Sequence, residues 1–195
     1  SFIPFTIGRG SLACDNTSQT TRGGGSMVRA SRLPMLCLAL VLVAGLGTAA
    51  GEDSPTNLIA QADLAYMTRH LQQSMTEAIA LYEAVLPSLD TLSDWNQAYV
   101  LNRLSQLCYE AALFAEGHTP EDEELYTKGK EYGFRSLRLN QQFAAHESEG
   151  LRGALAYVTD VVAMHWTANN WGMLCGIHPI QGLLEQGSVL ALFSR

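Results

Sequence analysis

Apolar residues recur at three- and four-residue steps along most of the chain after position 57, the period of an α-helix that faces a core. The first stretch covers residues 58–71. The second covers 74–89, where seven apolar side chains from Met75 to Leu89 share one helical face and Pro87 marks the end. No stretch alternates with a period of two over the length of a strand, so we expect no β-sheet.

Helix-start chemistry then divides the chain. Ser93 is placed to cap a long helix that ends near Glu116. The run Thr119–Asp122 combines a capping residue, a proline at the first helical position and carboxylates at the positive end of the helix dipole. It therefore predicts a helix over 120–139 and explains its acidic start without a cation site.

Gly129 and Gly133 lie one turn apart inside that helix. Each glycine costs about 1 kcal/mol relative to alanine in a helix interior. Two on one face are reasonable if another helix backbone packs closely there, so we expect a tight helix crossing.

The last third predicts three further helices. One covers 148–157, and a second runs from a cap at Thr159 or Asp160 to about Leu174. The third carries an apolar stretch over 183–193 that no later helix of the chain covers. We expect this stretch to self-associate.

Successive helices with short links and small residues at their crossings predict an all-α fold, an α-solenoid of paired antiparallel helices. The pair over 58–89 has tetratricopeptide character, with Ala78, Tyr82 and a proline near its turn. The helix over 120–139 resembles the second helix of another such pair. Residues 51–195 then form one helical-repeat domain that is incomplete at its C-terminal end.

The first fifty residues carry two patterns. Residues 1–26 are rich in Ser, Thr and Gly without an apolar period, which indicates a non-native or disordered leader. Residues 27–50 have basic residues, then an uncharged apolar run, then small residues, the pattern of a secretory signal peptide cleaved near Ala49 or Ala50. A retained membrane anchor is the alternative.

Charge is distributed unevenly. Four of the 12 basic and one of the 19 acidic residues precede residue 51, which leaves 8 basic against 18 acidic residues and a net charge of about −10. Such a body repels phosphate backbones, so we expect no nucleic-acid partner. After cleavage Cys108 and Cys175 remain; an exported compartment permits a disulfide, whereas apolar helical surroundings favour free thiols.

No catalytic or metal constellation is recognisable. His146, His165 and His178 match no zinc-site spacing, and no serine lies in a nucleophile elbow. We therefore expect no catalytic residue, no metal and no cofactor. An enzyme that uses the histidines is the remaining alternative.

Three segments in order resemble a specific family. They are Glu77–Leu86 (EAIALYEAVL), Tyr126–Leu137 (YTKGKEYGFRSL) and Asp160–Gly172 (DVVAMHWTANNWG). They look like the T component associated with TRAP transporters, a periplasmic helical protein with tetratricopeptide-like repeats. The resemblance covers roughly residues 58–193.

The resemblance implies a non-catalytic periplasmic accessory protein of a TRAP-type solute uptake system. Its partners would be the system's solute-binding protein, an apolar small ligand and further copies of itself. Family members are often lipoproteins, whereas no lipobox is visible here, and they continue beyond the length of this chain. A generic periplasmic helical-repeat scaffold for protein interactions is the alternative.

Two tryptophans and two asparagines in the third segment are the candidate ligand-binding residues. Apolar walls with a few orienting amides are typical of small-molecule sites. This interpretation assigns the site to Trp166, Asn169, Asn170 and Trp171. The alternative is that the tryptophans belong to the core and the amides bind neighbouring backbone.

Overall fold

The computed structural model describes residues 54–114 and 119–194, which lie in one compact unit of the chain. The expected leader 1–26, the signal peptide 27–50 and the link after the third helix lie outside the described residues. Within the described part every regular element is a helix and no strand is present. The all-α prediction is confirmed.

Eight α-helices and three short 3-10 helices follow one another. The α-helices are α1 (Pro55–Met67), α2 (Gln72–Val85), α3 (Asp94–Phe114), α4 (Pro120–Arg138), α5 (Gln141–His146), α6 (Leu151–Ala154), α7 (Val161–Ile177) and α8 (Pro179–Phe193). The 3-10 helices are η1 (Leu86–Thr91), η2 (Glu147–Glu149) and η3 (Leu155–Tyr157).

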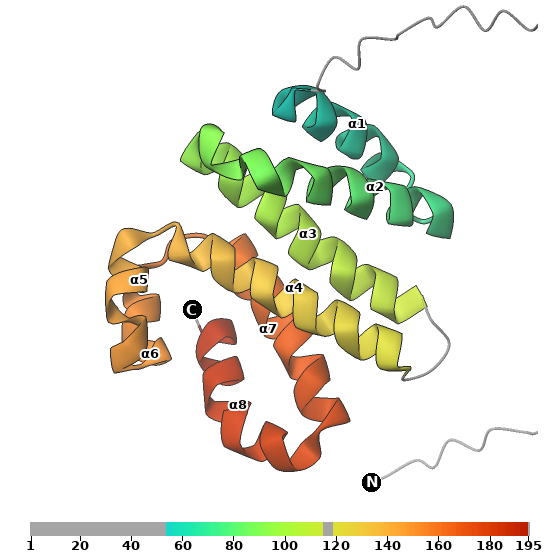
Figure 1. Ribbon diagram of the computed structural model, residues 1–195. Coiled ribbons are helices and arrows are strands. Elements are labelled where there is room, and N and C mark those ends of the chain that lie inside the picture. Colours follow the sequence, from blue (N-terminus) through green and yellow to red (C-terminus); the bar gives the residue numbers. More distant parts are fainter. Residues whose placement is uncertain (1–53, 115–118, 195) are drawn as a thin grey trace, which may run out of the picture. The chain divides into compact units, whose positions relative to one another are not determined.

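The long helices pack as antiparallel neighbours (Figure 1). Helix α1 lies on α2, and α3 and α4 run side by side in opposite directions. Helix α7 contacts both α4 and α3, and α8 folds back along α7 after the single connecting residue His178. The short helices α5 and α6 fill the connection between α4 and α7.

The expected helix starts are confirmed. Thr119 Oγ1 accepts from the backbone N–H of Asp122, and the Asp122 carboxylate accepts from the N–H of Thr119, which forms a reciprocal capping box. Asp160, rather than Thr159, caps α7 through the N–H groups of its first turn. The acidic start of α4 therefore has a structural explanation.

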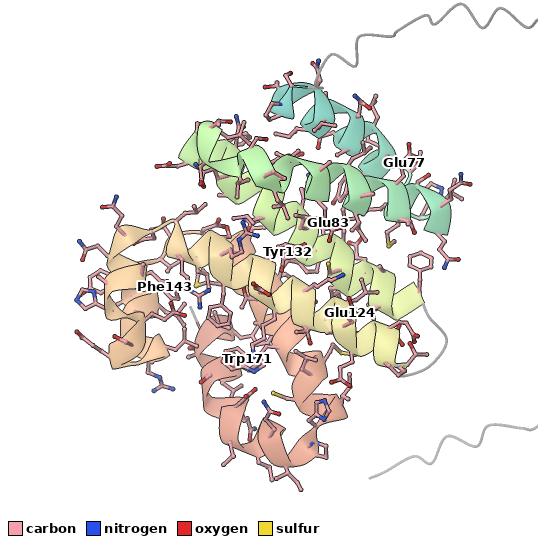
Figure 2. The ribbon with its side chains drawn as sticks, viewed as in Figure 1. Glu77, Glu83, Glu124, Tyr132, Phe143 and Trp171 are labelled. Carbon is pink, nitrogen blue, oxygen red and sulfur yellow. The ribbon has the colours of Figure 1, made fainter. Side chains whose placement is uncertain are left out.

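Two apolar clusters make up the core. The first joins α1, α2 and α3, and the second joins the end of α4 to α5, α6, α7 and α8. Tyr132 of α4 belongs to the first cluster, and its hydroxyl donates to Glu83 of α2 at 2.9 Å (Figure 2). Burial, and then this hydrogen bond, raise the pKa of Tyr132, so it stays a donor. Helix α4 thus connects the two clusters.

The tight crossing expected at the glycine pair is confirmed, and its partner is α7. A Cβ on Gly133 would lie 2.1 Å from Thr167 Oγ1 and 3.1 Å from the Thr167 Cα. A Cβ on Gly129 would lie 2.3 Å from Asn170 Oδ1. Only glycine leaves room for α7 at both positions.

One expectation on the helices was wrong, and one helix was not expected. The single helix over 148–157 is divided among η2, α6 and η3, because Gly150 adopts a φ of 138° that interrupts a continuous helix. Helix α5 was not expected; Asn140 starts it by accepting from the N–H groups of Gln142 and Phe143. Trp95, in the first turn of α3, is 73% exposed.

Helix α8 leaves most of its larger apolar side chains exposed. Val189 and Leu192 are buried against α7, whereas Leu184 is 85% exposed and Leu183 76% exposed. Taken over the described part of the chain, no helix is both long and apolar enough to span a bilayer.

Candidate functional site

A groove of about 490 Å³ opens between the first half of α3 and the start of α7. We call it the α3–α7 groove. Small-molecule sites commonly have volumes of about 300–1,000 Å³. Its lining residues are Trp95, Ala98, Tyr99, Asn102, Arg103 and Gln106 from α3, with Thr159, Asp160 and Val162 from the start of α7.

The α3 wall is a stripe of three large side chains. Trp95, Tyr99 and Arg103 follow at four-residue steps, so they lie on one side of the helix. The rings of Trp95 and Tyr99 stack with centroids 5.5 Å apart, and the guanidinium carbon of Arg103 is 5.1 Å from the Tyr99 centroid. The exposed indole of Trp95 offers this groove an aromatic surface.

A half-buried carboxylate holds the Tyr99 hydroxyl on the side away from the groove. Asp63 of α1 accepts from the hydroxyls of Tyr99 at 2.6 Å and of Tyr82 at 2.5 Å. Burial raises the pKa of Tyr82, and the hydrogen bond to Asp63 raises it further, so Tyr82 remains a donor. The position of the groove wall therefore depends on α1 and α2 as well as on α3.

Arg103 is held by aromatic rings and an amide. Its guanidinium carbon lies 3.9 Å from the Tyr66 centroid, and its Nη1 donates to Gln106 Oε1 at 3.1 Å. Its Nε is buried without a hydrogen-bond partner, and none of the ion pairs among the described residues includes Arg103. The groove therefore contains a part-buried cation that forms no ion pair with a described residue.

The opposite wall contains a carboxylate that is fully engaged. Asp160 Oδ1 accepts from the backbone N–H groups of Val162 and Ala163, both at 3.0 Å, and Oδ2 accepts from Asn102 Nδ2 at 2.9 Å. A helix N-terminus stabilises such a negative charge. The Asn102 Oδ1 atom is buried and has no partner among the described residues.

The four predicted ligand residues lie in three different surroundings. Val162, Trp166 and Asn169 follow at steps of four and three residues, so Trp166 and Asn169 continue the groove-facing side of α7. The Trp166 ring lies 5.8 Å from the ring of Tyr109 on α3. Asn169 Nδ2 donates to the His165 carbonyl at 2.9 Å. This pair lies along the α3–α7 seam, beyond the residues that line the groove.

Asn170 lies in the interior of the helix packing. It is fully buried, and its Nδ2 donates to the Ser105 carbonyl at 3.0 Å, to Ser105 Oγ at 3.3 Å and to the Trp166 carbonyl at 2.9 Å. Ser105 Oγ in turn donates to the Gly129 carbonyl at 2.7 Å. The amide thus connects α3, α4 and α7. It binds neighbouring backbone carbonyls, which is what the alternative interpretation of these residues expected.

Trp171 faces a different part of the molecule, between α4 and α8 (Figure 2). Its indole N–H donates to Glu185, its ring packs edge-on against Phe134, and Lys130 Nζ lies 4.1 Å from its centroid. The hydrogen bonds from Trp171 and Gln181 lower the pKa of Glu185. The two tryptophans therefore do not form one site, and ligand binding by the four residues stays a prediction.

The histidines lie far apart in the fold. His178 Nε2 is 2.8 Å from Glu123 Oε1 at the α7–α8 corner, His146 packs on Tyr157, and His165 packs on Trp166. No three His, Cys, Asp or Glu side chains converge to hold a metal ion within the segments that the structure describes. Burial raises the pKa of the Cys108 thiol to about 12, and Cys108 and Cys175 are both free thiols.

Sequence reasoning missed the stripe of Trp95, Tyr99 and Arg103. The signal was available, because an aromatic pair followed by a basic residue at four-residue steps predicts a shared helical side. In the sequence these residues served only to predict the helix that begins after Ser93.

Comparisons with family models, with characterised proteins and with solved structures give no significant match to this chain. The relation to the TRAP-associated T component therefore stays a prediction from the three resembling segments.

Proposed function

We propose that this chain is a non-catalytic, exported accessory protein of a TRAP-type solute uptake system. On this proposal it acts in the periplasm and binds the system's solute-binding protein together with an apolar small ligand. Support comes from the three resembling segments and from the acidic, helical character of the chain. The α3–α7 groove is the observation that carries the binding role.

The order of helix contacts supports the finer description of the fold as a tetratricopeptide-like α-solenoid. Helices pack in the sequence α1–α2–α3–α4–α7–α8, so each long helix contacts its neighbour in that order. Repeat proteins have this nearest-neighbour character and use their exposed surfaces to bind partners. The short helices α5 and α6 are an insertion between two pairs on this description.

The groove has the character of a binding surface. Exposed tryptophans are enriched where proteins bind partners, because the indole is a large and rigid contact. Here the open ring of Trp95 lies beside the part-exposed Val162 and the polar side chains of Arg103 and Asn102. A mixed apolar and polar groove of this kind suits a small molecule or a partner's side chain.

Site-specific cross-linking tests the partner. A photoreactive phenylalanine derivative would replace Val162 on the groove wall, and Glu77 on the exposed side of α2 would carry it in a matched control. In cells that also produce a TRAP solute-binding protein from the same organism, we expect that protein to be cross-linked at position 162 only. Cross-linking to a different periplasmic protein would favour the generic scaffold, and cross-linking at both positions would exclude the groove as the contact.

Export is tested separately. Expressed from Met27 in a Gram-negative host, the protein should be recovered from the periplasm with a mass that corresponds to an N-terminus near Gly51. An uncleaved chain in the membrane fraction would contradict the cleaved signal peptide and support a retained anchor.

A second observation favours self-association. Ile180, Leu183, Leu184, Leu190 and Phe193 of α8 are each more than half exposed. Burying one such side chain is worth about 1.5–3 kcal/mol relative to exposure. We propose that this α8 face, defined by these five residues, mediates a homo-oligomer.

A further inference from the structure

Arg103 is a part-buried cation whose Nε has no hydrogen-bond partner and which takes part in none of the ion pairs among the described residues. The guanidinium lies over Tyr66 and beside Tyr99, and its one described hydrogen bond goes to the neutral amide of Gln106. A cation removed from water is costly unless a negative group compensates it. The groove therefore contains a part-buried cation for which the described residues provide no ion-pair partner.

The neighbouring carboxylates are already engaged. Asp160 accepts three hydrogen bonds from Asn102 and from the first turn of α7. Glu110 pairs with Arg69 at 2.8 Å, and Asp63 accepts from two tyrosines. Each therefore has its own hydrogen-bond donors, and none of them forms an ion pair with Arg103.

Arg69 provides an internal comparison. Its guanidinium carbon also lies over Tyr66, at 4.0 Å, yet its Nε contacts Glu110 directly. Two arginines thus share one aromatic ring, and one has a carboxylate while the other faces the groove. By analogy with Arg69, the group that would complete the contacts of Arg103 is a carboxylate.

The rest of the groove specifies the body of the ligand. Trp95 and Tyr99 stack side by side, and Val162 lies on the facing wall. Two helical turns separate Trp95 from Arg103, about 12 Å along the axis. A flat ring that contacts Trp95 therefore needs a short flexible chain to bring a carboxylate to Arg103.

We propose that the α3–α7 groove binds a small aromatic carboxylate, with its ring on Trp95 and its carboxylate on the Arg103 guanidinium. This inference rests on the proposed binding role of the groove and names its ligand class. Arg103 supplies specificity through charge and a planar set of donors, and Trp95 supplies affinity through contact area.

Calorimetric titration of the full exported chain with three probes tests the inference. 4-Phenylbutyrate has the ring and the charge, 4-phenylbutanamide has the ring without the charge, and butyrate has the charge without the ring. Hydrogen bonds to charged groups contribute about 1.5–3 kcal/mol, so the acid should bind about tenfold to a hundredfold more tightly than the amide. Butyrate should bind too weakly to measure.

Matched variants locate the effect. Arg103→Gln should bind acid and amide equally, whereas Arg69→Gln should keep the preference of the wild type because its partner Glu110 lies outside the groove. Trp95→Ala, at an exposed position, should weaken acid and amide alike. Circular dichroism of each variant checks that the helices are retained.

The outcomes separate this inference from the function on which it rests. Equal binding of acid and amide to the wild type would overturn the role of Arg103 and leave groove binding intact. Binding of neither would overturn the ligand class, while the cross-linking at position 162 tests the partner independently. The wild-type comparison decides the inference even if Arg103→Gln fails to fold.

Discussion

The contact between α4 and α7 and the outer face of α8 use glycine in opposite ways. At the first, Gly129 and Gly133 leave no room for a methyl group, because side chains of α7 occupy that space. On α8, Gly187 has no heavy atom within 4 Å of the position a Cβ would take. The same residue type thus marks a close helix crossing in one region and an open surface in the other.

The effect of a glycine on stability therefore depends on what surrounds it in the fold, and its presence in a helix does not decide that effect. The helix-propensity cost is about the same at both places, about 1 kcal/mol relative to alanine. Only the α4–α7 contact recovers that cost through closer packing and through the buried hydrogen bonds of Ser105 and Asn170. The outer face of α8 has no described contact that does so.

Gly133→Ala should have the largest effect on stability. Its new methyl group would meet the Thr167 side chain and also the Thr167 backbone at 3.1 Å, so α7 itself must move. Overpacking of this kind costs about 1–3 kcal/mol, more than the gain in helix propensity. Urea unfolding measures the free energy, and a more stable variant would show that the crossing is open.

Gly129→Ala should be nearly as destabilising, but its cost should depend on Asn170. All three nearest atoms that the new methyl group would meet belong to the Asn170 side chain. In an Asn170→Ala background the added cost should therefore fall, with a coupling of about 0.5–3 kcal/mol between the two sites. A double-mutant cycle in urea measures it, and strict additivity would contradict this contact.

Leu183→Glu with Leu184→Glu should change association more than folding. Both side chains are largely exposed, so the free energy of unfolding should change by less than about 0.5 kcal/mol for each. Light scattering after size-exclusion chromatography should show an oligomeric wild type and a monomeric double variant. A monomeric wild type would contradict association through the α8 face.

Leu190→Glu with Phe193→Glu would test the same face nearer the end of α8. The structure makes this pair the less clean choice, because both side chains are about half buried at 54% and 52% exposure. A loss of stability would then be mixed with a loss of association.

Gly187→Ala should have the smallest effect, and in the opposite direction. It adds helix propensity within α8 and meets no neighbour, so unfolding should become more costly by up to about 1 kcal/mol. The same urea series measures this gain. The measurement is made in the Leu183→Glu, Leu184→Glu background, where the proposed association through the α8 face cannot contribute, and destabilisation there would contradict the open surroundings of Gly187 within the chain.

Much of the fold could be predicted because its determinants are local. The proline and carboxylates after Thr119, the cap at Asp160 and the glycine pair in α4 each specify a feature within one or two turns. The break at Gly150 could not be predicted, because the sequence around a glycine in a helical pattern does not show whether its φ is positive. Which helix crosses the glycine pair also depends on contacts between distant residues.

The candidate site was harder to predict for the same reason. Trp166 and Trp171 are close in sequence, but helical rotation turns them toward α3 and α8 respectively. The four-residue steps from Trp95 through Tyr99 to Arg103 indicate one helical side, but they do not show what that side faces. The importance of Arg103 comes from Tyr66, a residue of another helix, and from the carboxylates that are bound elsewhere.

The way α1 is attached has a consequence for amide hydrogen exchange. Helix α1 packs mainly on α2, buries only Ala62 completely and reaches α3 through polar contacts, of Asp63 with Tyr99, Tyr66 with Gln106 and Arg69 with Glu110. Water can replace such contacts at little cost, whereas it cannot replace apolar burial. The amides of α1 should therefore exchange by detachment of that helix alone, while those of α3 wait for the whole unit to unfold.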